Sequence, residues 1–168
     1  MTKPTVRAIT AEPFTESSWS AFGWVPAEDT DPRDSSLRYE FALGDPHVNV
    51  IAHTYDEIEH GDSGPICDCF YRHDTHNQTL MPLNVDSVLA VAPADVDFAD
   101  RDDLDAVRAF LLRPLDRLTL ARGTWHWGPF PVEHDPVRLF NVQGKRYAED
   151  NTRVDLGERI GVVFEVVP

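Results

Sequence analysis

The stretch Tyr71–Gln78 holds the densest cluster of polar side chains in the sequence. It contains His73, His76 and Gln78, and the apolar run Leu80–Leu83 follows it. Imidazoles transfer protons near neutral pH and bind metal ions, and a turn can bring together two histidines three residues apart, which a straight strand cannot do. This pattern predicts side chains at the mouth of a pocket. A solvated loop that contains histidines is the plain alternative.

A second cluster, Arg122–Pro129, places His126 between Trp125 and Trp127. Successive side chains of a strand point to opposite faces, so the two tryptophans would pack on one face and His126 would occupy the other. A structural histidine with satisfied hydrogen bonds would fit the same residues. The functional interpretation is favoured because the two histidine clusters lie about fifty residues apart, as expected for a site assembled from different strands of a barrel.

Short strands joined by turns are expected to carry both clusters, because 13 prolines and 9 glycines are spread along the chain. About nine strands predict a mainly β barrel or jelly roll with one or two short helices, formed as a single domain over residues 1–168. The segments with β character are Val6–Ile9, Leu37–Leu43, Val48–Thr54, Cys67–Tyr71, Gln78–Pro82, Ser87–Ala92, Arg117–Ala121, Thr124–Trp127, Arg138–Val142 and Ile160–Val167.

Two segments are predicted to be helical. Glu16–Phe22 is a short helix with Thr15 as its N-cap and Gly23 as its stop. Asp100–Arg113 shows a helical apolar face, acidic residues in its first turn and a proline directly after it. The acidic stretch Glu28–Ser36 is expected to be an exposed loop.

The composition excludes several kinds of partner. The chain has 29 acidic and 15 basic residues, a formal net charge of −14, which repels nucleic acid and anionic membranes. An anionic substrate would therefore need a local arginine. Met1–Thr10 has no apolar run typical of a secretory signal, and Cys67 and Cys69 are too close for an unstrained disulfide. We expect buried free thiols and a cytoplasmic location.

The sequence resembles the ureidoglycolate lyase family. The similarity extends from about Ile9 to Val142, and its specificity rests on the order and spacing of several short motifs. These are Ile9–Phe14, Phe22–Gly23, Arg72–His73, Gln78, Pro82, Val107–Leu111 and Arg122–His126.

The resemblance implies a cupin-like β-barrel that splits ureidoglycolate, a small anion, into glyoxylate and urea. Such a reaction needs a general base and a general acid, and the substrate carboxylate needs a cationic partner. The resemblance then assigns His126 as the acid/base residue, Gln78 as the residue that positions the ureido group, and His73 as a second catalytic or ligand residue. Arg72 or Arg122 would hold the carboxylate.

Cofactor use stays open at this point. The lyase chemistry requires no cofactor, but His76 could join His73, Gln78 and His126 in binding a divalent metal ion. Such an ion would polarise a carbonyl or hydroxyl oxygen of the substrate.

Two alternative functions also remain. The chain could be a cupin enzyme acting on another small carboxylic or sugar acid, or a small-molecule-binding cupin without catalytic activity. Departures from the family pattern favour the first of these alternatives. They are Tyr71, Trp127, Arg138 and Gln143.

A homodimer is also expected, because barrels of this kind often pair through edge strands that would otherwise expose backbone hydrogen-bonding groups. The C-terminal segment Ile160–Val167 could add to its own barrel or to that of a partner. Light scattering that shows a monomer at micromolar concentration would contradict the dimer.

Overall fold

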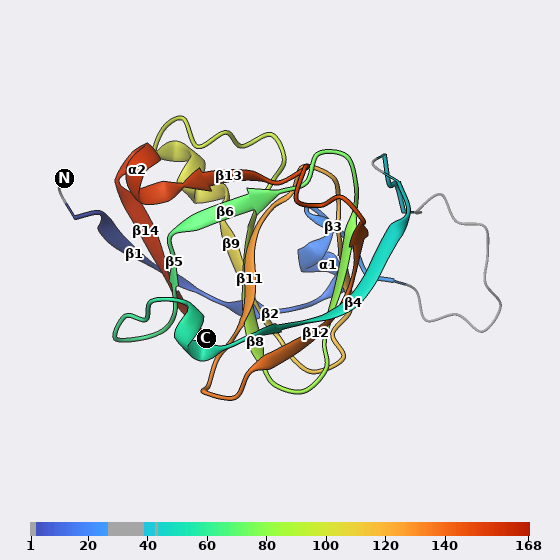
Figure 1. The fold of residues 1–168 in the computed structure, drawn as a ribbon. Helices are drawn as coiled ribbons and strands as arrows, with labels where there is room; N and C mark the ends of the chain where they lie inside the picture. Colours follow the sequence, from blue (N-terminus) through green and yellow to red (C-terminus); the bar gives the residue numbers. More distant parts are fainter. Residues whose placement is uncertain (1–2, 27–38, 43) are drawn as a thin grey trace.

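The computed structural model describes residues 3–26, 39–42 and 44–168 (Figure 1). Fourteen strands dominate this part of the chain and confirm the mainly β class. The helical elements are all short: α1 (Glu16–Trp19), η1 (Tyr55–Glu57), η2 (Asp102–Ala106) and α2 (Leu156–Ile160).

The strands form three sheets. The first has the order β1-β14-β5, from Thr5–Thr10, Val162–Val167 and Ile66–Cys67. The second has the order β3-β10-β7-β12-β4, from Gly23–Trp24, Leu118–Leu120, Gln78–Pro82, Val137–Gly144 and Pro46–His53. The third has the order β13-β6-β11-β8-β9-β2, from Thr152–Asp155, Cys69–Arg72, Trp125–Pro131, Ser87–Ala92, Arg108–Leu112 and Glu12–Pro13.

The third sheet packs on both of its faces. Alternate residues of β8 belong to different apolar clusters: Val88, Ala90 and Ala92 to one, Leu89 and Val91 to the other. The first cluster includes the inward side chains of β14, and the second includes those of β10 and β12. The third sheet therefore lies between the other two, with β1 and β14 at one side of the molecule and β4 at the other (Figure 1).

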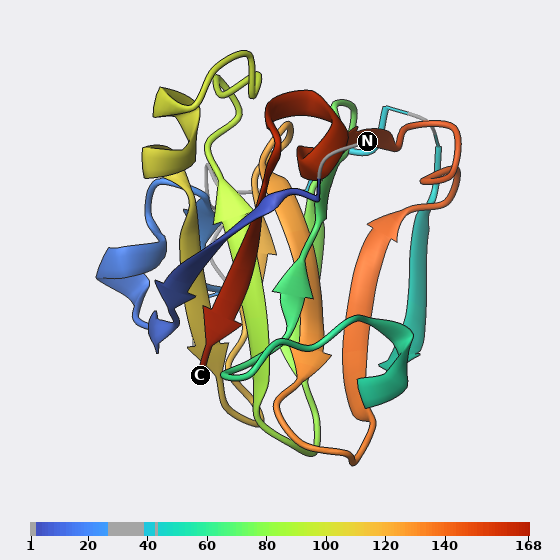
Figure 2. The same cartoon turned by 90° about the vertical axis from the view of Figure 1, so that its left-hand side faces the viewer.

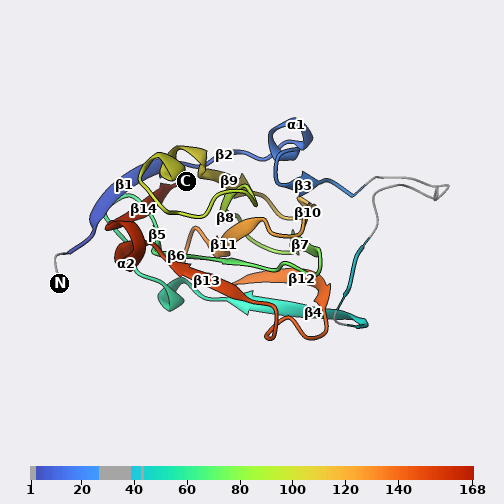
Figure 3. The same cartoon turned by 90° about the horizontal axis from the view of Figure 1, so that it is seen from above.

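The second sheet carries the elements that later form one wall of a pocket. β4 and β12 lie side by side along their whole length, with His53 opposite Val137 and Pro46 opposite Gly144 (Figure 2). Seen from above, they form one side of the molecule and α1 projects from the opposite side (Figure 3).

The prediction of a helix over Asp100–Arg113 is wrong in its second half. Only Asp102–Ala106 is helical, as the 3-10 helix η2, and Arg108–Leu112 is the strand β9. Both faces of β9 are buried against apolar clusters, so its apolar residues follow no two-residue alternation. A short, fully buried strand and a buried helical segment have similar apolar patterns in sequence, so the pattern alone did not distinguish them here.

Most other predicted elements are confirmed. Thr15 caps α1, although the helix ends at Trp19, four residues before Gly23. The strand predicted over Cys67–Tyr71 is split at Asp68 into β5 and β6. The predicted loop Glu28–Ser36 lies outside the described residues, as do both ends of the predicted strand Leu37–Leu43. In the described part of that strand, Phe41 forms an isolated bridge with His76.

The C-terminal segment adds to its own chain. β14 pairs in parallel with β1 and antiparallel with β5, and the helix α2 precedes it where strand had been expected from Ile160. Cys67 and Cys69 are both free and buried, as predicted. In the parts of the chain described here, every helix is too short to cross a membrane.

Candidate active site

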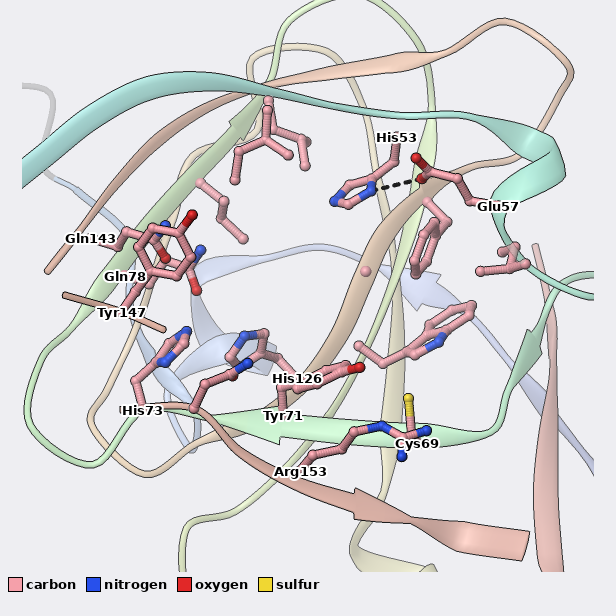
Figure 4. A pocket seen from close by; sticks show the side chains of 18 of the residues that line it. His53, Glu57, Cys69, Tyr71, His73, Gln78, His126, Gln143, Tyr147 and Arg153 are labelled. Carbon is pink, nitrogen blue, oxygen red and sulfur yellow. Dashed lines mark hydrogen bonds and ion pairs between the residues drawn. The ribbon is translucent and has the colours of Figure 1, made fainter. Parts of the chain in front are cut away.

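A cavity of about 700 Å³ opens between the second and third sheets (Figure 4). We call it the histidine pocket. The same interlayer space is filled by apolar side chains, including Leu89 and Leu139, in the cluster next to it. The pocket is lined from the third sheet by Tyr71, His126 and Phe130 and from the second sheet by Asn49, His53, Gln78 and Gln143, with His73, Tyr147 and Arg153 at the adjoining loops and strand.

His126 lies on β11 and faces the pocket, while Trp125 and Trp127 belong to the apolar cluster between the first and third sheets. The alternation predicted for this strand is confirmed for Trp125 and His126, whereas Trp127 also borders the pocket beside Phe130. The Nδ1 atom of His126 lies 3.2 Å from the carbonyl oxygen of Thr124. A carbonyl can only accept, so Nδ1 carries the proton and Nε2 presents a lone pair.

His73 follows the end of β6 and is buried at the pocket wall. Its Nδ1 atom donates to the carbonyl oxygen of Asp150, so its Nε2 atom also presents a lone pair. Gly123 donates its backbone N–H to the His73 carbonyl at 2.7 Å with a φ of 78°. That left-handed conformation favours glycine. The hydrogen bond links the two clusters that contain His73 and His126.

Gln78 completes the set of sequence-predicted residues in the pocket. Its Nε2 donates to Asn141 Oδ1 at 2.9 Å, and Asn141 in turn donates to Asn49 Oδ1 at 2.8 Å. The Gln78 Oε1 atom is buried and accepts no hydrogen bond from the described residues. This amide chain leaves a buried, unpaired acceptor on a residue that lines the pocket.

His76 lies behind His73, outside the pocket lining. It is 1% exposed, its ring stacks on His73 with centroids 4.5 Å apart, and its Nδ1 lies 3.1 Å from Asp150 Oδ2. A Cβ atom at Gly144 would lie 2.9 Å from the His76 ring, so position 144 must be glycine for this histidine to fit.

The possible metal ligands only partly converge. His73, His76 and Asp150 have ligand atoms within 4.8 Å of one another. The two imidazoles, however, are stacked with an interplanar angle of 22° and centroids 4.5 Å apart, so their in-plane lone pairs lie in two separate, nearly parallel planes and do not meet at one point. Asp150 already accepts from the backbone of Asp74 and Thr75 and from the Thr75 hydroxyl. A divalent ion would require these rings to rotate, and His126 and Gln78 lie outside this group.

The two arginines predicted to bind a carboxylate lie outside the pocket. Arg72 packs its guanidinium over Trp125, 4.5 Å from the ring centroid, and lies 3.2 Å from Asp74. Arg122 pairs with Glu40 at 2.7 Å on the surface. The pocket instead contains Arg153 of β13, beside the Cys69 thiol and the Tyr71 ring.

Sequence reasoning missed Arg153 because it did not predict the four-residue strand β13. It also missed His53 and Glu57, which line the pocket from β4 and η1. A signal was available for His53: it continues the alternation of Asn49 and Ile51 on the inward face of a predicted strand.

Burial favours the neutral form of His73, His76 and His126. Burial lowers the pKa of His126 to about 3 and also lowers the pKa values of His73 and His76. Burial opposes ionisation of Asp150 as well, but hydrogen bonds from Thr75 and Asp74 outweigh it and lower the pKa of that carboxyl.

These shifts predict acid sensitivity. An unfolded imidazole titrates near pH 6.5, so below about pH 6.5 the unfolded chain binds more protons than the folded chain, and stability falls as the pH falls toward 3. Urea denaturation at about pH 7 and pH 5 should show a lower free energy of unfolding at pH 5, with a smaller drop in His126→Gln. Equal drops in the two proteins would contradict this assignment.

The chain matches a known protein family. Residues 6–163, nearly the whole chain, match the family model described as ureidoglycolate lyase. No curated protein matches the chain.

Proposed function

Because the chain belongs to the ureidoglycolate lyase family, we propose that the histidine pocket cleaves the hemiaminal C–N bond of ureidoglycolate and releases glyoxylate and urea. The observation that carries this proposal is the set of unpaired acceptors in the pocket: Nε2 of His126, Nε2 of His73 and Oε1 of Gln78. Ureidoglycolate offers matching donors, its carbinol hydroxyl and its ureido N–H groups. Unpaired buried acceptors favour a ligand that donates to them.

The reaction begins at the carbinol. His126 Nε2 removes the hydroxyl proton, the oxygen lone pair forms the new carbonyl, and the C–N bonding electrons pass to the ureido nitrogen, which must gain a proton. Burial keeps His126 neutral, so Nε2 is free to accept a proton, and it also makes the imidazole a weaker base than one in water. His73, 5.3 Å away between ring centroids, accepts a ureido N–H as the second catalytic residue, and Gln78 orients the urea end.

Arg153 is the carboxylate partner in this proposal. It is the one lysine or arginine among the described residues that line the pocket, and its planar guanidinium can pair with a carboxylate in bidentate fashion. It shares its charge with Asp155, 3.3 Å away on the same strand. The net charge of −14 makes such a local cation necessary for an anionic substrate.

Arg153 and Arg72 form a matched pair for testing this role. Arg153→Gln should raise KM about 10- to 100-fold, because a charge-assisted hydrogen bond contributes about 1.5–3 kcal/mol. Arg72→Gln should leave KM unchanged, since that side chain packs on Trp125 outside the pocket. Steady-state kinetics of both variants checks this. A higher KM in Arg72→Gln than in Arg153→Gln would indicate that Arg72 binds the substrate carboxylate.

The reaction itself is tested with pure protein and racemic ureidoglycolate. Urea and glyoxylate should appear in equal amounts and faster than in the spontaneous reaction, with similar rates after chelation and after addition of Mn²⁺ or Zn²⁺. No release under any of these conditions would remove the lyase proposal. Release only with added metal would favour the His73, His76 and Asp150 group as an ion site.

One observation favours a second candidate. A cavity of about 700 Å³ is far larger than ureidoglycolate, so a larger carboxylic or sugar acid would also fit. Ligand-induced changes in thermal stability across a set of small carboxylic and sugar acids would distinguish the two. A strong shift with a sugar acid and none with glyoxylate or urea would favour this candidate.

A further inference from the structure

We infer that His53, held by Glu57, is the general acid that gives the departing urea nitrogen its proton. This role rests on the proposed lyase function and adds to it a residue pair that neither the sequence resemblance nor the family match assigns. The inference comes from the position, the hydrogen bonding and the accessibility of the pair.

His53 and His126 lie on opposite walls of the histidine pocket. His53 is the last residue of β4 in the second sheet, and His126 lies on β11 in the third sheet. Figure 4 shows His53 and Glu57 across the pocket from His126, with Gln78 to one side and Arg153 beyond Tyr71 and His126. In the proposed complex the ureido group lies at Gln78, the carboxylate is directed toward Arg153, and the reacting carbon lies between the two imidazoles.

Glu57 controls the proton positions on His53. The Nδ1 atom of His53 lies 2.9 Å from Glu57 Oε2, which also accepts the Thr54 backbone N–H at 3.1 Å. A carboxylate only accepts, so Nδ1 carries a proton and Nε2 is left on the side of the ring away from Glu57. The ring also packs against Phe130, with centroids 4.9 Å apart. The hydrogen bond to Glu57 and the contact with Phe130 therefore fix the orientation of the His53 ring.

The two imidazoles have environments suited to opposite roles. The His126 residue is 8% exposed and is kept neutral, as a base must be. The His53 side chain is 29% exposed, so solvent reaches it, and its Nδ1 atom is hydrogen-bonded to the Glu57 carboxyl group. Two titratable groups with such different surroundings are the usual basis for dividing acid and base roles.

With His126 as base and His53 as acid, the protons taken up and released in one catalytic cycle are equal. His126 Nε2 takes the carbinol proton as the C=O bond forms and the C–N bond breaks. The nitrogen that receives the bonding electrons takes the proton from Nε2 of the His53 imidazolium, which gives urea. His126 then loses its proton and the partly exposed His53 regains one, so the cycle consumes no proton and needs no other reactant.

The test compares kcat and KM for urea release in the wild type, His53→Gln and Glu57→Gln. His53→Gln should lower kcat by about 10²-fold or more with little change in KM, as expected for loss of a general acid. Glu57→Gln keeps an acceptor for Nδ1 but removes the charge, so its loss of kcat should be smaller. His134→Gln is the matched control, because His134 is an exposed histidine that contacts Tyr55 outside the pocket.

A second arm separates an acid role from a structural one. Added imidazole should restore part of kcat in His53→Ala and have no effect on the control. An unchanged kcat in His53→Gln, a rise in KM alone, or no rescue by imidazole would each overturn the role of His53 while leaving the lyase reaction intact. A wild-type protein that releases no urea would overturn the proposed reaction, and this role with it.

Discussion

Replacing His126 by glutamine is expected to lower kcat for urea release by about 10²- to 10⁴-fold, the contribution typical of a general base. Glutamine keeps polar atoms in the buried site but cannot accept the carbinol proton. The effect should be on kcat, because the contacts that bind the two ends of the substrate come from Gln78 and Arg153 in the proposed complex. Measuring initial rates of urea and glyoxylate release over a range of substrate concentrations gives both constants.

The matched control for this variant is His60→Gln. His60 stacks on Tyr55 with centroids 3.7 Å apart and does not line the histidine pocket. Circular dichroism and thermal unfolding should show that both variants fold. A His126→Gln protein that folds and retains the wild-type kcat would exclude His126 as the base and would shift the search to His73.

The second large effect concerns stability. Phe110→Ala is expected to lower the free energy of unfolding by about 3–5 kcal/mol. Phe110 is fully buried on β9, and its ring contacts those of Phe14, Trp19 and Phe22 at centroid distances of 6.3, 5.4 and 5.8 Å. Removing it would leave a cavity where α1 packs on the third sheet. Chemical denaturation monitored by tryptophan fluorescence measures the loss.

Leu115→Ala is the comparison, since Leu115 is among the most exposed apolar side chains of the described residues. It should change the free energy of unfolding by less than about 0.5 kcal/mol. If Phe110→Ala were as stable as Leu115→Ala, the Phe110 ring would not be packed between β9 and α1 as described. Because domains are stable by only about 5–15 kcal/mol, the predicted loss is a large share of the total.

The sequence predicted the strands that alternate or end in clear turns. Gln78–Pro82 and Ser87–Ala92 have the predicted bounds, because turn residues flank both segments. Arg108–Leu112 was misassigned because it is buried on both faces, and its neighbours that decide this are distant in sequence. Such pairing depends on tertiary contacts that no local pattern contains.

In the candidate site, too, the residues with a local sequence pattern could be predicted and those placed by distant contacts could not. His73, Gln78 and His126 could be predicted because each lies in or beside a strand with a readable pattern, and the structure brings all three to one pocket. Arg72 and Arg153 show the limit. They lie on the adjacent strands β6 and β13, where Arg72 is opposite Thr152 and Arg153 is opposite Tyr71. Arg72 packs on Trp125 and Arg153 lines the pocket, and this difference depends on β13. The catalytic roles of all these residues remain predictions.

The contact between Gly144 and His76 has a consequence for how the sequence can vary. The two positions lie 68 residues apart but share one small volume, since a Cβ atom at 144 would overlap the imidazole. A side chain can therefore appear at position 144 only in a chain that has a smaller residue at position 76. The loss of His76 would in turn remove one contact of the Asp150 carboxylate, which Asp74 and Thr75 still hold, and uncover the face of His73 on which His76 stacks. Substitutions at these two positions should thus occur together, and a change in a glycine outside the pocket could alter the chemistry inside it.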